Sequence, residues 1–118
     1  MGNPVKMEIS RETLGTVEVL RARGRLIIGP PSHALETRTN EIIALGAKKM
    51  VLELSGVDYL DSAGLGTLIG CVGHAKEAGV DLRVAGITPR VRQILKITET
   101  EKVLPLEADI ASAVAALG

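Results

Sequence analysis

Two kinds of apolar pattern alternate along the chain. Short runs of branched apolar residues predict strands, and stretches in which apolar residues recur every three or four positions predict helices with one buried face. Two strands ahead of any helix predict an antiparallel hairpin, whereas strands separated by helices predict parallel pairing. The result is an α/β fold, with a mixed central sheet of four to five strands and about four helices packed mainly on one side. The predicted strands span 5–11, 16–23, 50–54, 80–85 and 103–106, and the predicted helices 33–45, about 63–78, 89–97 and 109–117.

Glycine, proline and hydroxyl residues predict where these elements end. Gly24 is expected to end the second strand, and Gly56 to mark a turn after the third. Residues 29–31, Gly-Pro-Pro, predict a connection outside the helix that follows, with Ser32 as its N-cap. The pair Thr88–Pro89 predicts an N-cap and the first residue of a helix.

The second strand carries apolar residues on both of its faces. Val17 and Val19 fall on one face, and Leu20 and Ala22 fall on the other, because side chains alternate along a strand. This strand is therefore expected to be covered in part on both sides. Phe and Trp are absent and Tyr59 is the only aromatic residue, so the core has to be aliphatic and base stacking on nucleic acid is not expected.

Length and charge narrow the class of protein. The chain has 118 residues, enough for one core, and we expect a single domain over 1–118. It carries 14 basic and 14 acidic residues, so no global charge favours nucleic acid or an anionic membrane. A single cysteine, Cys71, excludes an internal disulfide and a multi-cysteine metal site. No signal peptide or run of about 18 apolar residues is present, which predicts a cytoplasmic protein without direct membrane insertion.

The stretch 50–71 is the centre of the functional argument. An apolar strand runs into a polar turn with Asp61 and Ser62, and a helix opens at about Ala63. Unpaired backbone N–H groups and the helix dipole favour negative charge at such a helix N-terminus, so a phosphoryl group on Ser62 would be well placed. The alternative is that Ser62, or Asp61 before it, is only an N-cap.

The residues around this turn do not form a known catalytic motif. The residue two places before Ser62 is Leu60, so the G-x-S-x-G nucleophile elbow is absent. Residues 64–67 lack the Gly-Lys-Ser/Thr ending of a phosphate-binding loop. The histidines have no metal-ligand spacing, and capping and solvation explain the carboxylates as well as a magnesium site would. An enzyme is therefore the less favoured hypothesis, and no catalytic residue, metal or cofactor is predicted. The histidines and carboxylates considered as catalytic or metal-binding residues were His33, His74, Glu53, Asp58 and Asp61.

Three glycines lie along the predicted central helix. Gly66, Gly70 and Gly73 share a stripe offset from its leucine face, although each weakens a helix by roughly 1 kcal/mol relative to alanine. They could allow tight packing against a neighbouring helix or the sheet, or they could form a docking surface for a partner beside Ser62. The spacing alone does not decide between the two.

These motifs together resemble a known family. The segment 52–70, LELSGVDYLDSAGLGTLIG, resembles the central motif of the STAS domain of anti-sigma factor antagonists, and residues 61–66 match its most recognisable part. The glycine after the second strand, the Thr88–Pro89 helix start and the alanine-rich final helix are also similar to that family. The resemblance covers nearly the whole chain.

The resemblance implies a protein-binding switch without catalytic activity. The unphosphorylated form would bind an anti-sigma factor that is also a serine kinase and so free a sigma factor. Phosphorylation of Ser62 would release the complex, and a separate phosphatase would reset it. A phosphate beside two carboxylates would add repulsion and a desolvation cost at the interface. The implied partner-binding residues are Asp58, Asp61, Ser62, Ala63, Gly64, Gly66 and Gly70.

One position departs from the family pattern. Relatives commonly carry an acid in a G-x-L/I-D pattern after the second strand, and here residues 24–26 lead to Ile27. If that acid serves kinase recognition, the protein is phosphorylated poorly, by another kinase, or not at all. This departure favours an alternative role as a non-switching scaffold or a cytoplasmic accessory subunit of a membrane transporter.

Overall fold

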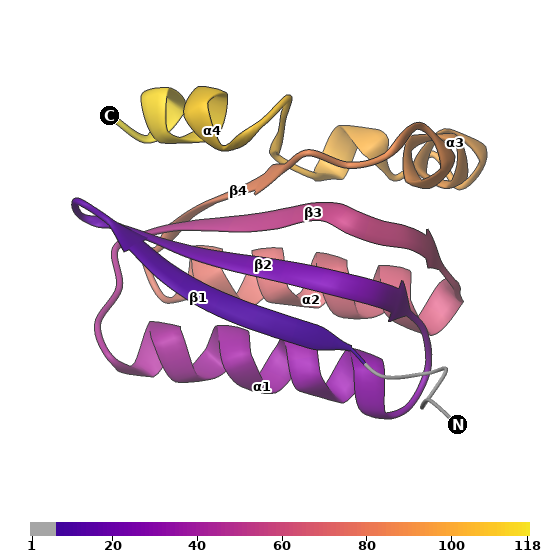
Figure 1. The fold of residues 1–118 in the computed structure, drawn as a ribbon, viewed down its shortest axis with the longest axis horizontal. Coiled ribbons are helices and arrows are strands. Elements are labelled where there is room, and N and C mark those ends of the chain that lie inside the picture. The colour runs from indigo at the N-terminus through magenta and orange to yellow at the C-terminus, as the bar shows by residue number, and fades with distance from the viewer. Residues whose placement is uncertain (1–6) are drawn as a thin grey trace.

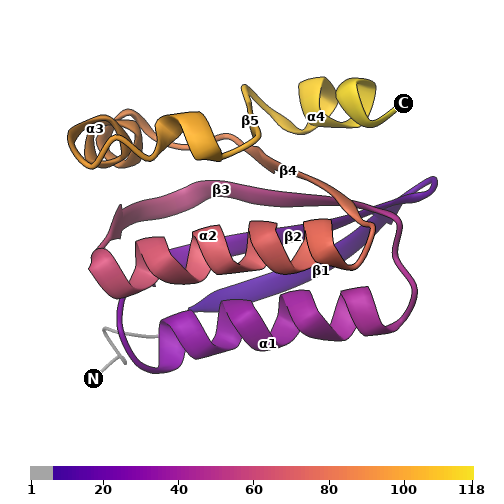
Figure 2. The ribbon, with the colours of Figure 1, turned by 180° about the vertical axis from the view of Figure 1, so that it is seen from behind.

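The computed structural model describes residues 7–118 and has one mixed sheet with the strand order β1-β2-β3-β4-β5 (Figures 1 and 2). β1 and β2 pair antiparallel, and every other neighbouring pair is parallel. The predicted α/β class and mixed sheet are therefore confirmed. The strands are β1 (Glu8–Leu14), β2 (Val17–Leu26), β3 (Lys49–Leu60), β4 (Asp81–Ala85) and β5 (Leu106–Glu107). The helices are α1 (Pro30–Ala44), α2 (Ser62–Glu77), α3 (Pro89–Ile97) and α4 (Ile110–Leu117), and a 3-10 turn spans Glu101–Val103.

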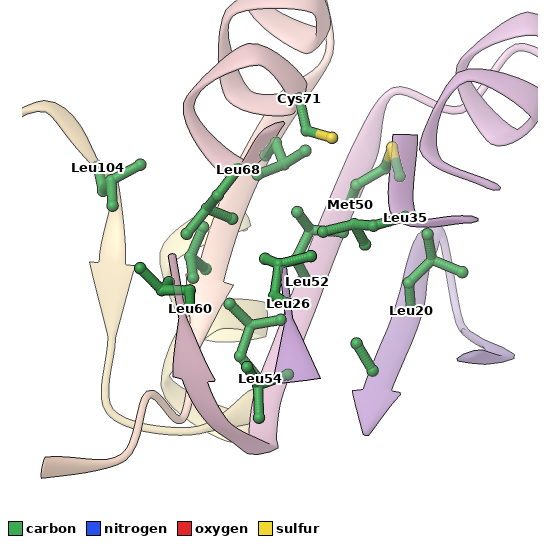
Figure 3. Packing of buried hydrophobic residues seen from close by; sticks show 14 of the residues in the cluster. Leu20, Leu26, Leu35, Met50, Leu52, Leu54, Leu60, Leu68, Cys71 and Leu104 are labelled. Carbon is green, nitrogen blue, oxygen red and sulfur yellow. The ribbon is translucent and has the colours of Figure 1, made fainter. Parts of the chain in front are cut away.

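The helices are divided unequally between two hydrophobic clusters. α1 and α2 run side by side on one side of the strands, and α4 lies on the other (Figures 1 and 2). The main cluster contains residues of α1, α2 and α3, and leucines of β2, β3 and α2 fill its centre (Figure 3). In both ribbon views α3 lies beyond β4, next to α4 (Figures 1 and 2). A smaller cluster joins α4 to the opposite face. Helices packed mainly on one side were predicted; α1 and α2 share one side, whereas α3 and α4 lie beyond β4.

β2 is covered on both faces, as its pattern predicted. Val17 and Val19 belong to the smaller cluster with α4, and Leu20 and Ala22 belong to the main one. On the face of β2 that packs against α4, the residues after Val19 are therefore not covered by that helix.

The predicted end of the third strand is wrong. Gly56 does not begin a turn but lies inside β3 opposite Arg23, and β3 continues to Leu60. The register with β2 shifts between Arg21 and Arg23 and again between Gly24 and Arg25, which marks bulges. A bulge lets a strand continue past an extra residue while increasing its local twist. Gly24 likewise lies within β2, which ends at Leu26.

The beginning of α1 also differs from the expectation. Pro30 and Pro31 are its first residues, and Gly29, with a φ of 93°, is the N-cap in place of Ser32. Proline is tolerated in the first turn because its missing N–H would have no helical partner there. The Ser32 hydroxyl instead donates to the Ile27 carbonyl oxygen at 2.7 Å.

The remaining boundaries agree to different degrees. Thr88 caps α3 and Asp109 caps α4, and α3 has the predicted bounds. The hairpin turns at Gly15 and Thr16 rather than over 12–15. The last strand holds only two residues, because the chain before it forms the 3-10 turn. Residues 5 and 6 of the first predicted strand lie outside the described residues.

A buried hydroxyl in α1 gives a test of packing. Thr39 has no exposed surface, and its Oγ1 makes no hydrogen bond of good geometry among residues 7–118, its nearest polar neighbour being the weakly bonding Cys71 thiol. We expect Thr39→Val to raise the free energy of unfolding by about 1 kcal/mol, because a similar shape replaces an unpaired polar atom. Urea unfolding would measure the change. Thr37→Val is the control, since Thr37 is less buried and its hydroxyl contacts His33; destabilisation by Thr39→Val would contradict the expectation.

Candidate functional site

One residue connects the central strand to the central helix. β3 ends at Leu60 and α2 begins at Ser62, one residue before the predicted start, so Asp61 alone forms the junction. The Asp61 backbone is extended, and its Oδ1 accepts a hydrogen bond from the Gly64 N–H at 2.7 Å. Asp61, not Ser62, is therefore the N-cap of α2.

Asp61 also holds the loop between β2 and α1 against this junction. Its Oδ2 accepts a hydrogen bond from the Ile28 N–H at 3.0 Å, and its own N–H donates to the Leu26 carbonyl oxygen at 3.3 Å. The bond from Gly64, followed by the bond from Ile28, lowers the pKa of Asp61 below the usual aspartate value. The junction thus contains a stable carboxylate next to Ser62.

Ser62 is exposed at the first position of α2. Its hydroxyl makes no hydrogen bond with another residue of the described range 7–118, because Asp61 already serves the α2 N-terminus. Ser62 is therefore an exposed residue whose hydroxyl is not used by the described part of the chain.

Gly64 allows two backbone segments to meet beneath Ser62. It is buried, and a Cβ built on it would overlap the Leu26 carbonyl oxygen and lie 2.7 Å from the carbonyl carbon. No residue with a side chain fits there without a backbone shift. Gly64 therefore positions the site from below.

The other glycines of α2 are not needed for packing within the chain. Gly66 and Gly70 are exposed and Gly73 is half-buried, and a Cβ on any of them would meet nothing within 4 Å. Ser62, Gly66 and Gly70 follow one another at intervals of four, so they lie along one side of α2. Tight packing against the described chain thus does not explain these glycines, and the docking alternative stays a prediction.

A groove beside Ser62 brings in a helix that sequence reasoning did not assign to the site. Its volume is about 330 Å³, and one wall is formed by Ile94 of α3 and by Thr98, the C-cap of that helix. Ile94 and Ser62 meet in this groove only through the tertiary fold, because they belong to different helices. The remaining lining residues are Tyr59, Leu60, Asp61, Ser62 and Leu65.

The predicted site residues and their neighbours differ in how exposed they are. Asp58 is exposed near the end of β3, and Ala63 is half-buried in the first turn of α2. On the opposite side of Asp61, Ile28 is 72% exposed, and Ile27 accepts the two bonds of Ser32 through its carbonyl oxygen. The loop that departs from the family pattern therefore lies directly beside the junction and presents an apolar side chain.

We expect Asp61→Ala to lower the free energy of unfolding by about 1 to 2 kcal/mol at neutral pH, because α2 loses its cap. The pKa of Asp61 is lowered in the folded state. Its contribution is thus complete above the unfolded-state aspartate pKa of about 3.9 and is lost as the pH falls through the lower folded-state pKa.

Chemical unfolding of wild type and Asp61→Ala between pH 7 and pH 2 would measure this loss. The difference between their free energies of unfolding should become smaller as the pH falls. Asp58→Ala is the control: Asp58 is an exposed neighbour, and its replacement should change stability by less than about 0.5 kcal/mol. A difference that stays constant with pH would contradict the capping role of the carboxylate.

Comparisons with known proteins place this geometry in context. The STAS domain family model matches residues 8–113. A STAS-domain containing protein of Pseudomonas aeruginosa (strain UCBPP-PA14) is 32% identical over 87 residues, covering 74% of this chain and 84% of that protein. The crystal structure of an anti-sigma factor antagonist from Mycobacterium paratuberculosis is 25% identical, with a TM-score of 0.81 and coverage of 98% and 97% of the two chains.

The same fold occurs in a protein of a different description. The crystal structure of a sulfate transporter family protein from Wolinella succinogenes is 17% identical, with a TM-score of 0.71 and coverage of 89% of this chain and 87% of that one. Within residues 7–118, no helix combines the length and apolar character needed to cross a membrane.

Proposed function

The chain belongs to the STAS domain family, and from this premise we propose that it is an anti-sigma factor antagonist. In this proposal it is a non-catalytic binding module of the cytoplasm. Its unphosphorylated form binds an anti-sigma factor that is also a serine kinase, and a sigma factor is released. Phosphorylation of Ser62 ends the binding, and a phosphatase restores it.

The exposed and uncommitted hydroxyl of Ser62 is the observation that carries the proposal. Asp61 caps α2, so modification of Ser62 breaks no hydrogen bond among the described residues. A phosphate adds about 1.5 to 2 negative charges at a helix N-terminus, where the dipole stabilises them. Phosphorylation of Ser62 therefore leaves the fold intact but weakens the binding of a partner that covers Ser62.

The proposed binding surface follows α2 from this point. Ser62, Gly66 and Gly70 offer a side of the helix without bulky side chains, so a partner backbone can approach closely. Asp58 and Asp61 lie at its edge, and a phosphate beside them concentrates negative charge there. Like charges brought together at an interface cost several kcal/mol. Ala63 and Gly64 contribute by shape and position.

Recovery of the protein from its own cells tests this function. The protein is cross-linked to its partners, purified and analysed by mass spectrometry, and the peptide with Tyr59 and Ser62 is examined for phosphate. We expect an anti-sigma factor with a kinase domain and a phosphate on Ser62 in part of the population. A complex with transporter subunits and an unmodified Ser62 would contradict the proposal.

A second candidate is a non-switching scaffold or a cytoplasmic accessory subunit of a membrane transporter. Ile27, where the family commonly has an acid, favours it, and the fold also occurs in a sulfate transporter family protein. In that case Ser62→Asp would leave binding unchanged.

A further inference from the structure

Two arginines from different elements converge on the only tyrosine. The guanidinium carbon of Arg25 lies 5.1 Å from the centre of the Tyr59 ring, and that of Arg90 lies 5.8 Å from it. Both distances are within the range of a cation–π interaction. Arg25 pairs with Tyr59 across β2 and β3, whereas Arg90 belongs to the first turn of α3.

The positive charge of this cluster is not neutralised within the described chain. Among residues 7–118, neither Arg25 nor Arg90 has a carboxylate oxygen within 4.0 Å, although four other arginines form ion pairs there. Both side chains are exposed. A guanidinium that stacks on a ring keeps its N–H groups free at the edge, where they can donate to a carboxylate in a bidentate manner.

The cluster adjoins the groove beside Ser62. Tyr59 lines that groove, and Arg90 lies one helical turn before Ile94, which lines it from α3. The groove thus has an apolar wall at Leu65 and Ile94, and its lining residue Tyr59 is contacted by the two guanidinium groups.

We propose that this groove receives an acidic segment of the protein partner, with an aspartate or glutamate side chain bound between Arg25 and Arg90. The inference rests on the proposed function and specifies its partner. Charge complementarity selects this occupant, because neither guanidinium group is paired with a carboxylate among residues 7–118. Ser62 lines the same groove, so a phosphate on it repels that carboxylate.

A nucleic acid or an anionic membrane is a poorer match to this surface. Both need a broad basic patch, and here the carboxylates of Asp58 and Asp61 lie near the same turn. The Tyr59 ring is already engaged by two guanidinium groups, so it does not offer a free platform for a base.

The first test measures binding of the purified anti-sigma factor identified by the cross-linking experiment. Arg90→Glu is expected to weaken binding at least about tenfold. Lys96→Glu is the matched control, since Lys96 is exposed on the same helix and does not line the groove, and it should bind like wild type. Circular dichroism and thermal unfolding of each variant show whether it is folded.

The Ser62 variants separate the two proposals. If Ser62→Asp weakens binding and Arg90→Glu does not, the acidic-segment proposal is wrong and the switch stands. If neither has an effect, the proposed function is wrong. If both weaken binding, the combined variant should lose less than the sum of the two effects, because both act on the same contact; strict additivity would overturn the proposal.

The second test needs no natural partner. Hexaglutamate is titrated into the labelled protein and followed by NMR, and we expect shifts at Tyr59, Arg25 and Arg90 that disappear in Arg90→Glu and persist in Lys96→Glu. Shifts elsewhere, or none, would overturn the proposal. Stronger Arg90-dependent binding to phosphatidylserine vesicles or a thymidine oligonucleotide would assign the cluster to another class of partner and overturn it as well.

Discussion

Replacing Gly64 with alanine is expected to lower the free energy of unfolding by about 3 kcal/mol or more, a value at the upper end for overpacking. The new Cβ would overlap the Leu26 carbonyl oxygen and lie 2.7 Å from its carbonyl carbon. Leu26 cannot easily move away, because its side chain is fully buried and its carbonyl oxygen accepts the Asp61 N–H. Chemical denaturation of the purified variant would measure the loss.

Gly66→Ala is the matched control two residues further along α2. A Cβ at Gly66 meets nothing within 4 Å, so this variant should gain about 0.5 to 1 kcal/mol from helix propensity. The same chemical change is thus expected to have opposite signs at the two positions. Equal effects would contradict the close approach of α2 to the Leu26 backbone. A Gly66→Ala variant that is more stable but binds the partner less well would support the docking role of the stripe.

Gly64 and Gly66 show what can and cannot be predicted from neighbouring residues in the sequence. Both lie in one hexapeptide, 61–66, and both are direct neighbours of Leu65. What distinguishes them is the carbonyl group of Leu26, 38 positions before Gly64 in the chain. Apolar periodicity depends on neighbouring positions and therefore predicted the elements, but a close approach between distant segments leaves no mark in that periodicity.

The error in β3 has the same origin. A glycine after an apolar run is compatible with a turn and with a bulge. Gly56 stays within the strand, directly after a bulge, because β2 continues beside it with Arg23 as its partner. At α1 the expectation failed for a local reason: two prolines stop a helix interior but are accepted in its first turn.

The sequence predicted the strand–helix junction at the centre of the candidate site, but not the residues of other elements that surround it. Asp61 and Ser62 were both possible caps, and the fold decides between them through the Gly64 bond and the long-range bond to Ile28. The wall from α3 and the pair of arginines on Tyr59 could not be predicted, because their residues come from three separate elements.

Ser62→Asp is expected to weaken binding of the anti-sigma factor at least about tenfold, which corresponds to about 1.4 kcal/mol, and Ser62→Ala should bind like the unmodified protein. The aspartate places a fixed negative charge beside the Asp61 carboxylate, where the partner is matched to a neutral hydroxyl. Isothermal titration calorimetry with the purified partner would compare the three forms.

The stability of the same variants distinguishes a switch from damage to the fold. Ser62→Asp should unfold at the same or a slightly higher denaturant concentration, because a negative charge in the first turn of α2 is favourable by about 0.3 to 1 kcal/mol. Ser112→Asp is the control for the charge itself, since Ser112 lies in the first turn of α4 on the far side of the sheet. Weaker binding by Ser62→Asp alone, with stability retained, requires that the partner covers this hydroxyl; equal binding by all forms would rule out the switch.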